Sequence, residues 1–538
     1  MANTARDFDY VVVGAGSAGC VIATRLAEDP TSSVLLIEAG PKDWNPWIHV
    51  PAGYYRTIRT PSISWGYKSE PAAHLNGRQV NWPRGKVLGG SGAINGLVYI
   101  RGHPVDFEHW KSLGNEGWGW DDVLPFFLKC ENQERGVSKY HSTSGPIRVS
   151  DIKDRREVCD AFIKAGKSFG LQGRDDFNAG HQDGIGYYQL TMGQGRRSSP
   201  AAYLRQAKHA NLAIATNRSV VSLMVENRTA IGVNTLSEQG QFGAVRARRE
   251  IIVSCGAIGS PHLLQSSGIG PADVLKDAGV PVAHDLSGVG RNLTDRLQIR
   301  SVFRCNTATT LNDVYGSLIK KVIAGMRYAF FQTGPLTVGA GQAAAFLRTA
   351  PHLDRPDLEL TFMAFSTPGP GQKPHKFSGF TLLGYPLQPK SRGSIALTSP
   401  DISEPPRIDP GYLNDPYDLR MLEKAFWTCR AFADQPALKS LIVEEHMPGN
   451  SVQSQAQLEE YIRNNATSVF HSVGTCQMGV AEDPKSVVDS RLRVHGIRGL
   501  RVADASIMPT IVSGNTNATT MMIGEKAAAM IKEDWSGR

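Results

Sequence analysis

The sequence predicts an α/β domain that is interrupted by a second domain built on an antiparallel sheet. Three observations predict this arrangement. Residues 10–38 follow the order strand, glycine turn, helix, strand, the middle of the chain has short strand-like runs between proline-rich connections, and residues 499–533 return to a strand and a helix. The length of 538 residues alone suggests three or four domains. The order of the patterns indicates two, one of them split by the insertion of the other.

The composition, with 41% hydrophobic and 20% charged residues, is typical of a soluble globular protein and excludes a disordered chain, a fibre or a coiled coil. The net charge of +8 is small for this length and no run of five like charges occurs, so no nucleic-acid partner is expected. No stretch reaches 18 apolar residues, and the first residues lack the apolar core of a signal peptide. We therefore expect no transmembrane segment and a cytoplasmic protein.

The seven cysteines are scattered along the chain and include no C-x-x-C pair. This pattern is typical of buried thiols in a reducing compartment rather than of disulfides or a zinc site. We therefore expect no metal.

The first fifty residues carry the clearest motif. A short apolar run, Tyr10–Val13, ends in Gly14-Ala15-Gly16-Ser17-Ala18-Gly19, and a helical pattern (20–28) and a second strand (33–38) follow. In this kind of turn the first glycine permits the sharp bend, the second lets a pyrophosphate approach the backbone, and the third lets the helix pack close to the strand. The phosphates then lie at the helix N-terminus, where free N–H groups favour anions. The unit predicts a Rossmann-like site for an adenine dinucleotide.

Glu38 lies nineteen residues after Gly19, at the end of the second predicted strand, and Ala39 follows it. Its carboxylate can accept hydrogen bonds from both ribose hydroxyls and would repel a 2′-phosphate, so NADP is disfavoured. No second unit of this kind is found. Residues 288–293 lack the third glycine, and residues 251–259 form a strand entering a glycine turn that lacks the G-x-G spacing and is interrupted by Pro261. One dinucleotide site therefore has to serve the whole chain.

Residues 83–96 form a second glycine-rich segment, with five glycines in the twelve residues from Gly85 to Gly96. Only Arg84 and Lys86 are charged in it, which favours backbone lying against a flat or phosphorylated ligand. The alternative is a surface loop.

The middle of the chain, roughly 145–200 and 300–460, changes character. Strand-like runs at 357–362, 380–384 and 394–397 alternate with proline-rich connections such as 368–374, and they predict an antiparallel sheet. The C-terminal part returns to a strand at 499–503 and a helix from about 519 to 533.

Together these segments resemble the glucose–methanol–choline (GMC) oxidoreductases, a family of FAD-dependent alcohol oxidases and dehydrogenases. The resemblance covers nearly the whole chain and follows the family's order of motifs: 14–19, 84–95, 256–268, 288–293, 389–393 and 504–517. Within the family the chain is most similar to the bacterial choline-dehydrogenase-like branch. The resemblance implies FAD as cofactor, bound by a discontinuous α/β Rossmann-like domain, and an inserted α+β substrate domain with an antiparallel sheet.

The resemblance also implies where each domain and contact lies. The FAD-binding domain would take residues 1–145, 198–300 and 461–538, and the substrate domain would take 146–197 and 301–460. The cofactor-binding residues that it implies are Gly14, Ala15, Gly16, Ser17, Ala18, Gly19, Glu38, Ala39, Arg84, Gly89, Gly90, Asn95, Gly96, Leu97, Val98, Val220, Asp504, Ala505, Asn515, Thr516 and Asn517.

Two positions depart from the family pattern. Some members carry a histidine that bonds covalently to the flavin where this chain has Ile94, and isoleucine has no nucleophilic atom, so the FAD is expected to be non-covalent. Arg296 stands where histidine is commoner.

The resemblance places the catalytic pair at His471 and Asn515, 44 residues apart. His471 is expected to act as general base and take the hydroxyl proton of an alcohol, while a hydride passes from the carbinol carbon to flavin N5. A neutral imidazole suits this role because its ordinary pKa lies near working pH. Asn515 can donate its amide N–H to the substrate oxygen but cannot act as a base. We interpret His495 and Cys476 as structural, and His262 as packing the FAD-binding domain.

The sequence says less about the substrate. The resemblance implies pocket walls around 361–366 and 443–447, where Phe362, Met363, Phe365 and Met447 favour an aliphatic or aromatic alcohol over a sugar. No carboxylate–aromatic cage for the ammonium group of choline is evident. One further group of aromatic residues suits either a lid over the flavin or ordinary packing: Trp44, Trp47, Tyr54, Tyr55 and Trp65.

The leading hypothesis is oxidation of a primary or secondary alcohol to the carbonyl by a dehydrogenase that passes electrons to a quinone-type acceptor. A quinone acceptor would bring the protein to a membrane surface. The alternatives are an oxidase that uses O2 and gives H2O2, and a flavin lyase or photoenzyme on the same scaffold. A flavin-binding protein without catalysis is a further class, which has no need of the His471–Asn515 pair. The sequence carries no signal of oligomeric state.

Overall fold

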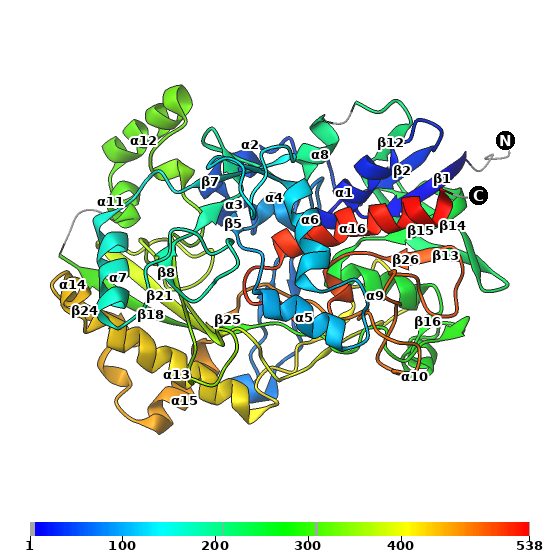
Figure 1. The fold of residues 1–538 in the computed structure, drawn as a ribbon. Coiled ribbons are helices and arrows are strands. Elements are labelled where there is room, and N and C mark those ends of the chain that lie inside the picture. The colour runs from blue at the N-terminus through cyan, green and yellow to red at the C-terminus, as the bar shows by residue number, and fades with distance from the viewer. Residues whose placement is uncertain (1–5, 207, 307–309, 537–538) are drawn as a thin grey trace.

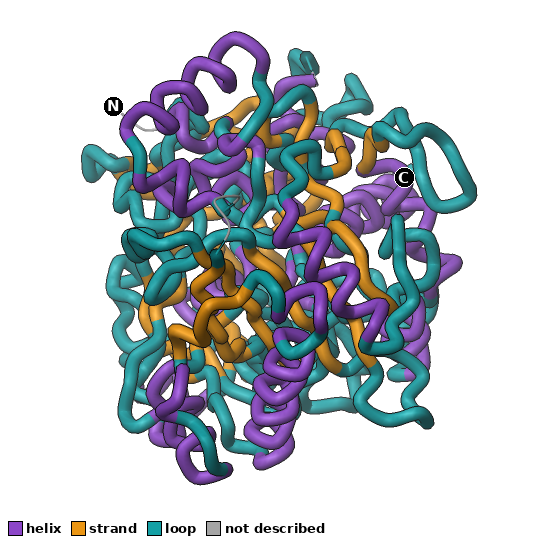
Figure 2. The backbone as a smooth tube through the Cα atoms, turned by 90° about the vertical axis from the view of Figure 1, so that its left-hand side faces the viewer, coloured by secondary structure: helices purple, strands orange, loops and turns teal. Residues whose placement is uncertain are grey.

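The computed structural model describes residues 6–206, 208–306 and 310–536, and two seven-stranded sheets organise it (Figure 1). Strands from residues 6–37, 212–253 and 500–502 build the first sheet. Strands from residues 184–187, 297–386, 442–447 and 467–468 build the second. In the side view of Figure 2 the strands lie largely inside, and helices and loops cover them.

The first sheet is mixed. Its order is β12 (Leu212–Ala215), β2 (Val34–Ile37), β1 (Arg6–Val13), β15 (Phe242–Val253), β14 (Thr229–Ser237) and β13 (Arg218–Glu226), with β26 (Leu500–Val502) beside β15. The pairings of β12, β2, β1, β15 and β26 are parallel, and β14 and β13 add an antiparallel extension. The central strands are almost uniformly apolar and buried because helices cover the parallel part of the sheet.

The two ends of the described chain meet on this sheet. Helix α1 (Ser17–Leu26) packs along α16 (Asn517–Trp535), whose residues are buried nearly all round, and Figure 1 shows the two helices side by side. Two polar contacts join them across 500 residues of sequence. Ser17 Oγ donates to Asn517 Oδ1 at 2.7 Å, and Arg25 forms an ion pair with Glu525 at 2.8 Å.

The second sheet is antiparallel throughout. Its order is β24 (Ile442–Met447), β18 (Leu297–Cys305), β21 (Gly379–Pro386), β20 (Leu358–Met363), β19 (Ala343–Leu347) and β8 (Gly184–Tyr187), with β25 (Thr467–Ser468) beside β18. Helices α7 (Glu157–Ser168) and α13 (Pro416–Ala433) pack on it. Stacked rings of Phe162, Phe362 and Phe380, with centroids 4.9 and 5.1 Å apart, form the centre of this core.

A small sheet connects the two large ones. It has the order β5 (Val98–Tyr99), β9 (Gln189–Leu190), β7 (Ile147–Asp151) and β6 (Glu131–Gln133). Its strand β5 directly follows the second glycine-rich segment, so this sheet sets the position of residues 95–98.

Two elements differ from the prediction. The run at 394–397 forms β22 (Ser394–Ala396), which pairs with β23 (Arg407–Asp409) in a separate two-stranded sheet. The segment after β15 becomes helix α9 (Gly256–Ser266) although it contains Pro261. A proline leaves the carbonyl four residues earlier without its helical partner. Here Thr475 Oγ1 donates to the Ala257 carbonyl at 2.7 Å, so the helix continues through Pro261.

No helix in the described part of the chain is long and apolar enough to cross a bilayer.

Candidate active site

A cavity of about 650 Å³ lies between the two large sheets. The glycine turn after β1, strand β13 and the start of α9 line it from one side, and β18, β20 and β21 line it from the other. The loops before α16 and after β25 complete the wall. The cavity is therefore bounded by segments from the entire length of the chain.

The glycine turn is packed too tightly for side chains. Gly14 has φ +94°, and a Cβ there would lie 2.6 Å from the Ser254 carbonyl oxygen. A Cβ on Gly19 would lie 1.9 Å from the Gly14 carbonyl oxygen, so Gly19 brings α1 close to the strand. The backbone of this turn is consequently open to the cavity at Gly14, Gly16 and Ser17.

Three helices begin at the cavity wall. Residues of the first turns of α1, α9 and α16 line it, and neither α1 nor α16 has a side chain capping its first N–H groups. Free N–H groups and the aligned helix dipoles make such a place favourable for anions. At α9 the N–H of Gly256 donates to Asp504 Oδ2 at 2.8 Å, and Ser506 N–H donates to Oδ1 at 2.7 Å.

Glu38 lies at the end of β2 and is buried in the cavity wall. Its carboxylate accepts the N–H of Ala15 and the N–H of Gly40, each at 2.9 Å. Burial raises the pKa of Glu38 to about 7, although these two hydrogen bonds favour the charged form.

The second glycine-rich segment lies against the first. Gly90 has φ +53°, and a Cβ there would lie 2.7 Å from the Gly16 Cα. Asn95 is held by the buried Arg197, which donates to the Asn95 side-chain oxygen at 2.7 Å and to its carbonyl at 2.8 Å. The alternative of a surface loop is thus excluded, because both glycine segments meet inside the molecule.

Most of the predicted cofactor residues reach the cavity. Those that line it are Gly14, Gly16, Ser17, Ala18, Glu38, Ala39, Arg84, Gly90, Asn95, Gly96, Leu97, Val98, Val220, Asp504, Ala505, Asn515, Thr516 and Asn517. Ala15, Gly19 and Gly89 do not line it. They shape the turns instead, as when Gly89 N–H donates to the Ala15 carbonyl at 2.8 Å.

His471 and Asn515 meet in the cavity wall. The amide nitrogen Nδ2 of Asn515 lies 3.0 Å from Nε2 of His471. The amide oxygen of Asn515, Oδ1, is buried and has no hydrogen-bond partner in the described residues. This polar atom is therefore free to meet a ligand.

Arg296 approaches the opposite side of the histidine ring, with Nη1 at 3.4 Å from Nδ1 of His471. A neutral imidazole has one N–H and one lone pair. A hydrogen bond from Arg296 would leave the ring proton on Nε2, whereas one from Asn515 leaves it on Nδ1. The two contacts therefore select opposite tautomers, and only the Asn515 contact, the shorter one, leaves Nε2 able to take a proton.

His471 is fixed in place and kept neutral. Its backbone N–H donates to Asp295 Oδ1 at 2.8 Å, and Asp295 Oδ2 accepts the hydroxyls of Ser468 and Tyr412, each at 2.5 Å. Burial, together with the positive charges of Arg296 and Arg84, holds the pKa of His471 well below its ordinary value of 6.5. The ring is therefore an uncharged acceptor at neutral pH.

Two non-glycine residues beside the site have left-handed backbone. Leu97 and Phe470, which immediately precedes His471, both have φ +67°. Such a conformation costs about 1–2 kcal/mol in a residue with a Cβ. It persists where surrounding contacts enforce it, which is common at functional sites.

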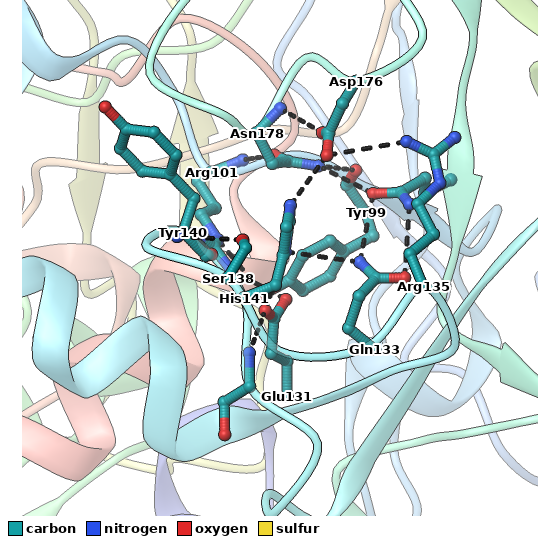
Figure 3. A network of polar contacts seen from close by, with 12 residues as sticks. Tyr99, Arg101, Glu131, Gln133, Arg135, Ser138, Tyr140, His141, Asp176 and Asn178 are labelled. Atoms are coloured by element: carbon teal, nitrogen blue, oxygen red, sulfur yellow. Dashed lines mark hydrogen bonds and ion pairs between the residues drawn. The ribbon is translucent and has the colours of Figure 1, made fainter.

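A buried ionic network supports the small sheet behind β5 (Figure 3). Arg101 pairs with Glu131 at 2.7 Å, and His141 contacts Glu131 at 2.9 Å and Asp176 at 2.7 Å. Burial opposes a charge on His141, but the hydrogen bonds with Asp176 and Glu131 outweigh it and raise its pKa to about 9. The charged ring of His141 thus links Glu131 to the segment that carries Asp176. Asn178, two residues further along that segment, donates to the Tyr99 carbonyl.

Some predicted pocket residues lie elsewhere. Thr361, Met363 and Phe365 line the cavity, but Phe362 is buried in the core and no residue of 443–447 reaches the wall. The physical reason is strand alternation for Phe362, and the edge position of β24 for 443–447. Of the aromatic group, Tyr54, Tyr55 and Trp65 line the cavity, whereas Trp47 packs under Arg56 and Trp44 is 78% exposed.

Neither His495 nor Cys476 lies in the cavity wall. His495 contacts the Gly479 carbonyl, and Cys476 is buried, where burial raises its pKa. His262, in contrast, lines the cavity from α9, and burial lowers its pKa to about 4.

The sequence reasoning missed several site residues, including Asp295, Arg197 and the pair Gln298 and Arg300, which line the cavity from β18. The alternation of apolar and polar residues in 297–300 was a signal for this strand and for its polar face.

Comparison with known proteins gives consistent matches over nearly the whole chain. Family models described as GMC oxidoreductase match residues 8–298 and 389–524. The chain is 40% identical over 528 residues to an alcohol dehydrogenase [acceptor] of Pseudomonas putida, covering 97% of this chain and 95% of that one. It is 38% identical to an oxygen-dependent choline dehydrogenase of Brucella melitensis, with the same coverage. The crystal structure of pyridoxine 4-oxidase from Mesorbium loti superposes with a TM-score of 0.87 at 32% identity, covering 99% of both chains.

Proposed function

Because the chain belongs to the GMC oxidoreductase family, we propose that it is an FAD-dependent enzyme that oxidises a primary or secondary alcohol to the carbonyl compound. The observation that carries this proposal is the His471–Asn515 pair, 3.0 Å apart, in the wall of a cavity that also contains the dinucleotide-type glycine turn. A binding protein without catalysis has no need of a neutral imidazole at this place.

The residues around the cavity fit FAD. The close packing at Gly14 and Gly90 leaves backbone rather than side chains facing the ligand, and the N-termini of α1 and α16 suit a pyrophosphate. Glu38 would accept the ribose hydroxyls, and the backbone at Val220 would meet the adenine. Asn95–Val98 and Asn515–Asn517 would hold the flavin ring, with the unpartnered Oδ1 of Asn515 as one polar contact.

Bound FAD supplies a two-electron acceptor for the hydride of the carbinol carbon. The chain's own residues handle the proton. Nε2 of neutral His471 accepts it from the substrate hydroxyl, while Nδ2 of Asn515 turns from the histidine to donate to the substrate oxygen. Burial and the positive charges of Arg296 and Arg84 make the resulting imidazolium more acidic than an exposed one, which favours passing the proton on to water.

We propose that the FAD is bound without a covalent bond. Ile94 precedes Asn95 in the cavity wall, and its side chain has no atom that could bond to the ring. Denaturation in acid should therefore release all of the flavin into the supernatant.

We propose the domain division 1–145, 198–300 and 461–538 for FAD binding, and 146–197 and 301–460 for the substrate. The membership of the strands supports it, since all strands of the first sheet fall in the first set. Strand β18 crosses the boundary at residue 300, and β25 joins the antiparallel sheet from the C-terminal segment.

We propose a quinone-type acceptor and peripheral association with an anionic membrane surface. Helix α12 (Leu318–Phe331) supports this, because it projects at the edge of the molecule in Figure 1 and turns an apolar face outward. Leu318, Ile319 and Phe330 are 72–78% exposed, whereas Ala324, on the inner side of the helix, is buried.

The charges around α12 favour anionic lipid over other partners. The segment 314–353 has no acidic residue, and Lys320, Lys321 and Arg327 flank the apolar face of the helix. A helix of this kind lies in the headgroup region with its basic side chains at the surface. α12 follows α11 (Leu311–Gly316), whose Tyr315 contacts the cavity-lining Tyr55 and Phe365. An oxidase using O2 remains the alternative and needs no such surface.

The test is anaerobic mixing of the purified holoenzyme with a panel of alcohols while the flavin absorbance near about 450 nm is recorded. Oxidation of an alcohol bleaches this band. His471→Ala should slow bleaching by about 10²-fold or more, whereas the control His495→Ala should leave it near the wild-type rate. A colourless protein that takes up no FAD, or a panel in which no alcohol bleaches the flavin, would refute the proposal.

A further inference from the structure

Two polar side chains of β18 face the cavity from the antiparallel sheet. Gln298 and Arg300 line it, whereas Ile299 between them is buried in the hydrophobic core. This is the two-residue alternation of a strand, so both polar groups project from the same face. Their neighbours in the wall include Thr361 and Met363 of β20 and Tyr385 of β21.

The positively charged guanidinium of Arg300 has few hydrogen-bond acceptors among the described residues. The residue is 6% exposed, and Nη2 donates to the Thr367 carbonyl at the long distance of 3.3 Å. Its Nε has no partner in the described residues, and it takes part in none of the ion pairs found there. A buried guanidinium with so few acceptors is costly, because burial of a charge is tolerated when the charge is paired and hydrogen-bonded.

Arg296, four residues earlier, is a buried arginine whose guanidinium has hydrogen-bond acceptors within the protein. It donates to the carbonyls of Leu387 at 2.9 Å, Gly514 at 2.7 Å and Val512. Arg300 has no such set of carbonyls among the described residues, although it is buried to a similar degree. The difference indicates that its acceptor comes from outside the chain.

No acidic side chain of this part of the wall, as far as the structure describes it, supplies that acceptor. The acidic residues that line the cavity are Glu38, Asp401 and Asp504. Glu38 and Asp504 accept backbone N–H groups at the nucleotide side, and Asp401 lies in an exposed loop. The two groups that favour the charge of Arg300 are the hydroxyls of Tyr461 and Tyr54, and burial lowers its pKa to about 10, which still leaves it protonated at neutral pH.

We propose that Arg300, with Gln298 beside it, binds a carboxylate of the substrate, so that the enzyme acts on a hydroxy acid rather than on a neutral or cationic alcohol. A guanidinium binds a carboxylate through two parallel hydrogen bonds, and this geometry adds specificity as well as affinity. The assignment rests on the proposed function, since it names the substrate class of that same site.

The strand also sets the spacing of the two groups. Arg296 contacts His471, and four residues of extended chain separate the Cα atoms of Arg296 and Arg300 by roughly 13 Å. The carboxylate should therefore be separated from the reacting carbinol by an aliphatic or aromatic spacer, which Met363, Leu383 and Tyr54 would contact. An α-hydroxy acid would be too short to reach both ends.

The experiment compares matched alcohols in anaerobic flavin reduction by the holoenzyme. The pairs are benzyl alcohol with 4-(hydroxymethyl)benzoate, and 1-decanol with 10-hydroxydecanoate. We expect the acid of at least one pair to be favoured at least tenfold in the ratio of reduction rate to apparent Kd. Arg300→Met should remove this preference, losing about 10- to 100-fold on the acid and changing the neutral alcohol by less than about threefold.

Two variants control for effects on folding. Arg304→Met removes an arginine four residues further along β18 that is 51% exposed and outside the cavity wall, and it should keep the preference. Arg300→Lys keeps the positive charge without the paired donors, so it should retain part of the preference for the acid. All variants should retain FAD. If Arg300→Met loses the cofactor while Arg304→Met keeps it, the guanidinium serves FAD and the assignment to substrate is wrong.

A measurement without turnover separates this inference from the proposed reaction. Benzoate should perturb the flavin spectrum of the wild type saturably, and much more weakly that of Arg300→Met. If benzoate binds in this way but no alcohol bleaches the flavin, the carboxylate site stands and the proposed reaction fails. If neutral alcohols bleach it as well as the acids, the reaction stands and the carboxylate site fails. Stronger competition by phenyl phosphate than by benzoate would also overturn the carboxylate assignment.

Discussion

Nη1 of Arg296 lies 3.4 Å from Nδ1 of His471, on the opposite side of the ring from Asn515, whose Nδ2 lies 3.0 Å from Nε2. Two donors thus face one neutral imidazole that has a single lone pair to offer. Arg296 opposes the tautomer that a general base needs and, together with burial, it favours the uncharged ring. The family resemblance of the sequence leads to histidine as the expected residue at this position, so Arg296 is a departure from the expected site.

Replacing Arg296 should change the pH dependence of the reaction. The low pKa of His471 means that kcat/KM stays level as pH falls through 6.5 and drops only at lower pH. Removing a positive neighbour raises that pKa, so Arg296→Met should move the acid limb of kcat/KM to higher pH. Arg296→Lys keeps a charge and should leave the limb near the wild-type position. Rates are normalised to bound flavin, and an unshifted limb in Arg296→Met would argue against the electrostatic role.

Glu38 should make FAD affinity depend on pH. With a pKa of about 7 in the cofactor-free protein, its carboxyl is protonated below that pH, whereas ribose hydroxyls stabilise the charged form. FAD binding therefore releases a proton below pH 7, and the Kd should rise by up to about tenfold per unit as pH falls. Titration of the apoprotein with FAD, followed by flavin fluorescence, measures this. Glu38→Gln should bind more weakly and show no inflection near pH 7, and parallel profiles for the two proteins would contradict the assignment.

Gly90 should be irreplaceable for cofactor binding because of its contact with Gly16. Gly90→Ala puts a Cβ 2.7 Å from the Gly16 Cα, which forces the two glycine segments apart. Gly77 also has a positive φ of +72°, and a Cβ added there would meet nothing within 4 Å, so Gly77→Ala carries about 1–2 kcal/mol of backbone strain without a clash. We expect flavin content to fall below about a tenth in Gly90→Ala and to stay near normal in Gly77→Ala.

Helix α12 should bind anionic vesicles. In co-sedimentation, the wild type should pellet with vesicles containing phosphatidylglycerol and much less with pure phosphatidylcholine. The double variant Ile319→Ser/Phe330→Ser should stay in the supernatant. Val137→Ser/Phe242→Ser removes two equally exposed apolar side chains elsewhere and should still pellet.

The basic residues of α12 can be tested by the same vesicle co-sedimentation. Lys320→Glu/Lys321→Glu should lose binding, whereas Lys164→Glu/Lys167→Glu on α7 should keep it. The wild type could instead fail to bind vesicles and elute as a dimer, while Ile319→Ser/Phe330→Ser elutes as a monomer. That result would show that this face binds a second copy of the chain.

The parts of the fold that depend on local pattern could be predicted. The unit of β1, α1 and β2 follows from apolar runs and a glycine turn, and α1 begins only three residues before the predicted start at 20. Helix α9 could not be predicted, because Pro261 normally ends a helix and its compensation by Thr475 comes from 218 residues away. Likewise, nothing local shows that 394–397 pairs outside the main sheet.

The site, too, has residues that the sequence could predict and residues that it could not. His471 and Asn515 lie in motifs and could be named, and the structure brings them together. Asp295 and Arg197 act through contacts with residues that are distant in the sequence, so the sequence around them has no catalytic pattern. The expected apolar pocket was partly wrong, since Phe362 points into the core and the opposite face of the sheet presents Gln298 and Arg300. Which face of a strand meets a cavity is decided by the packing of the whole sheet.

The hydrogen bond between Ser17 and Asn517 has a consequence for biosynthesis. When α1 leaves the ribosome, the helix that covers it is still 500 codons from being read, a delay on the order of 25–100 seconds at about 5–20 residues per second. During this time the nascent chain presents an apolar helix face and an incomplete nucleotide pocket. The pocket is complete only after α16 has been synthesised, so the supply of chaperones and of free FAD at that moment should govern the yield of active protein.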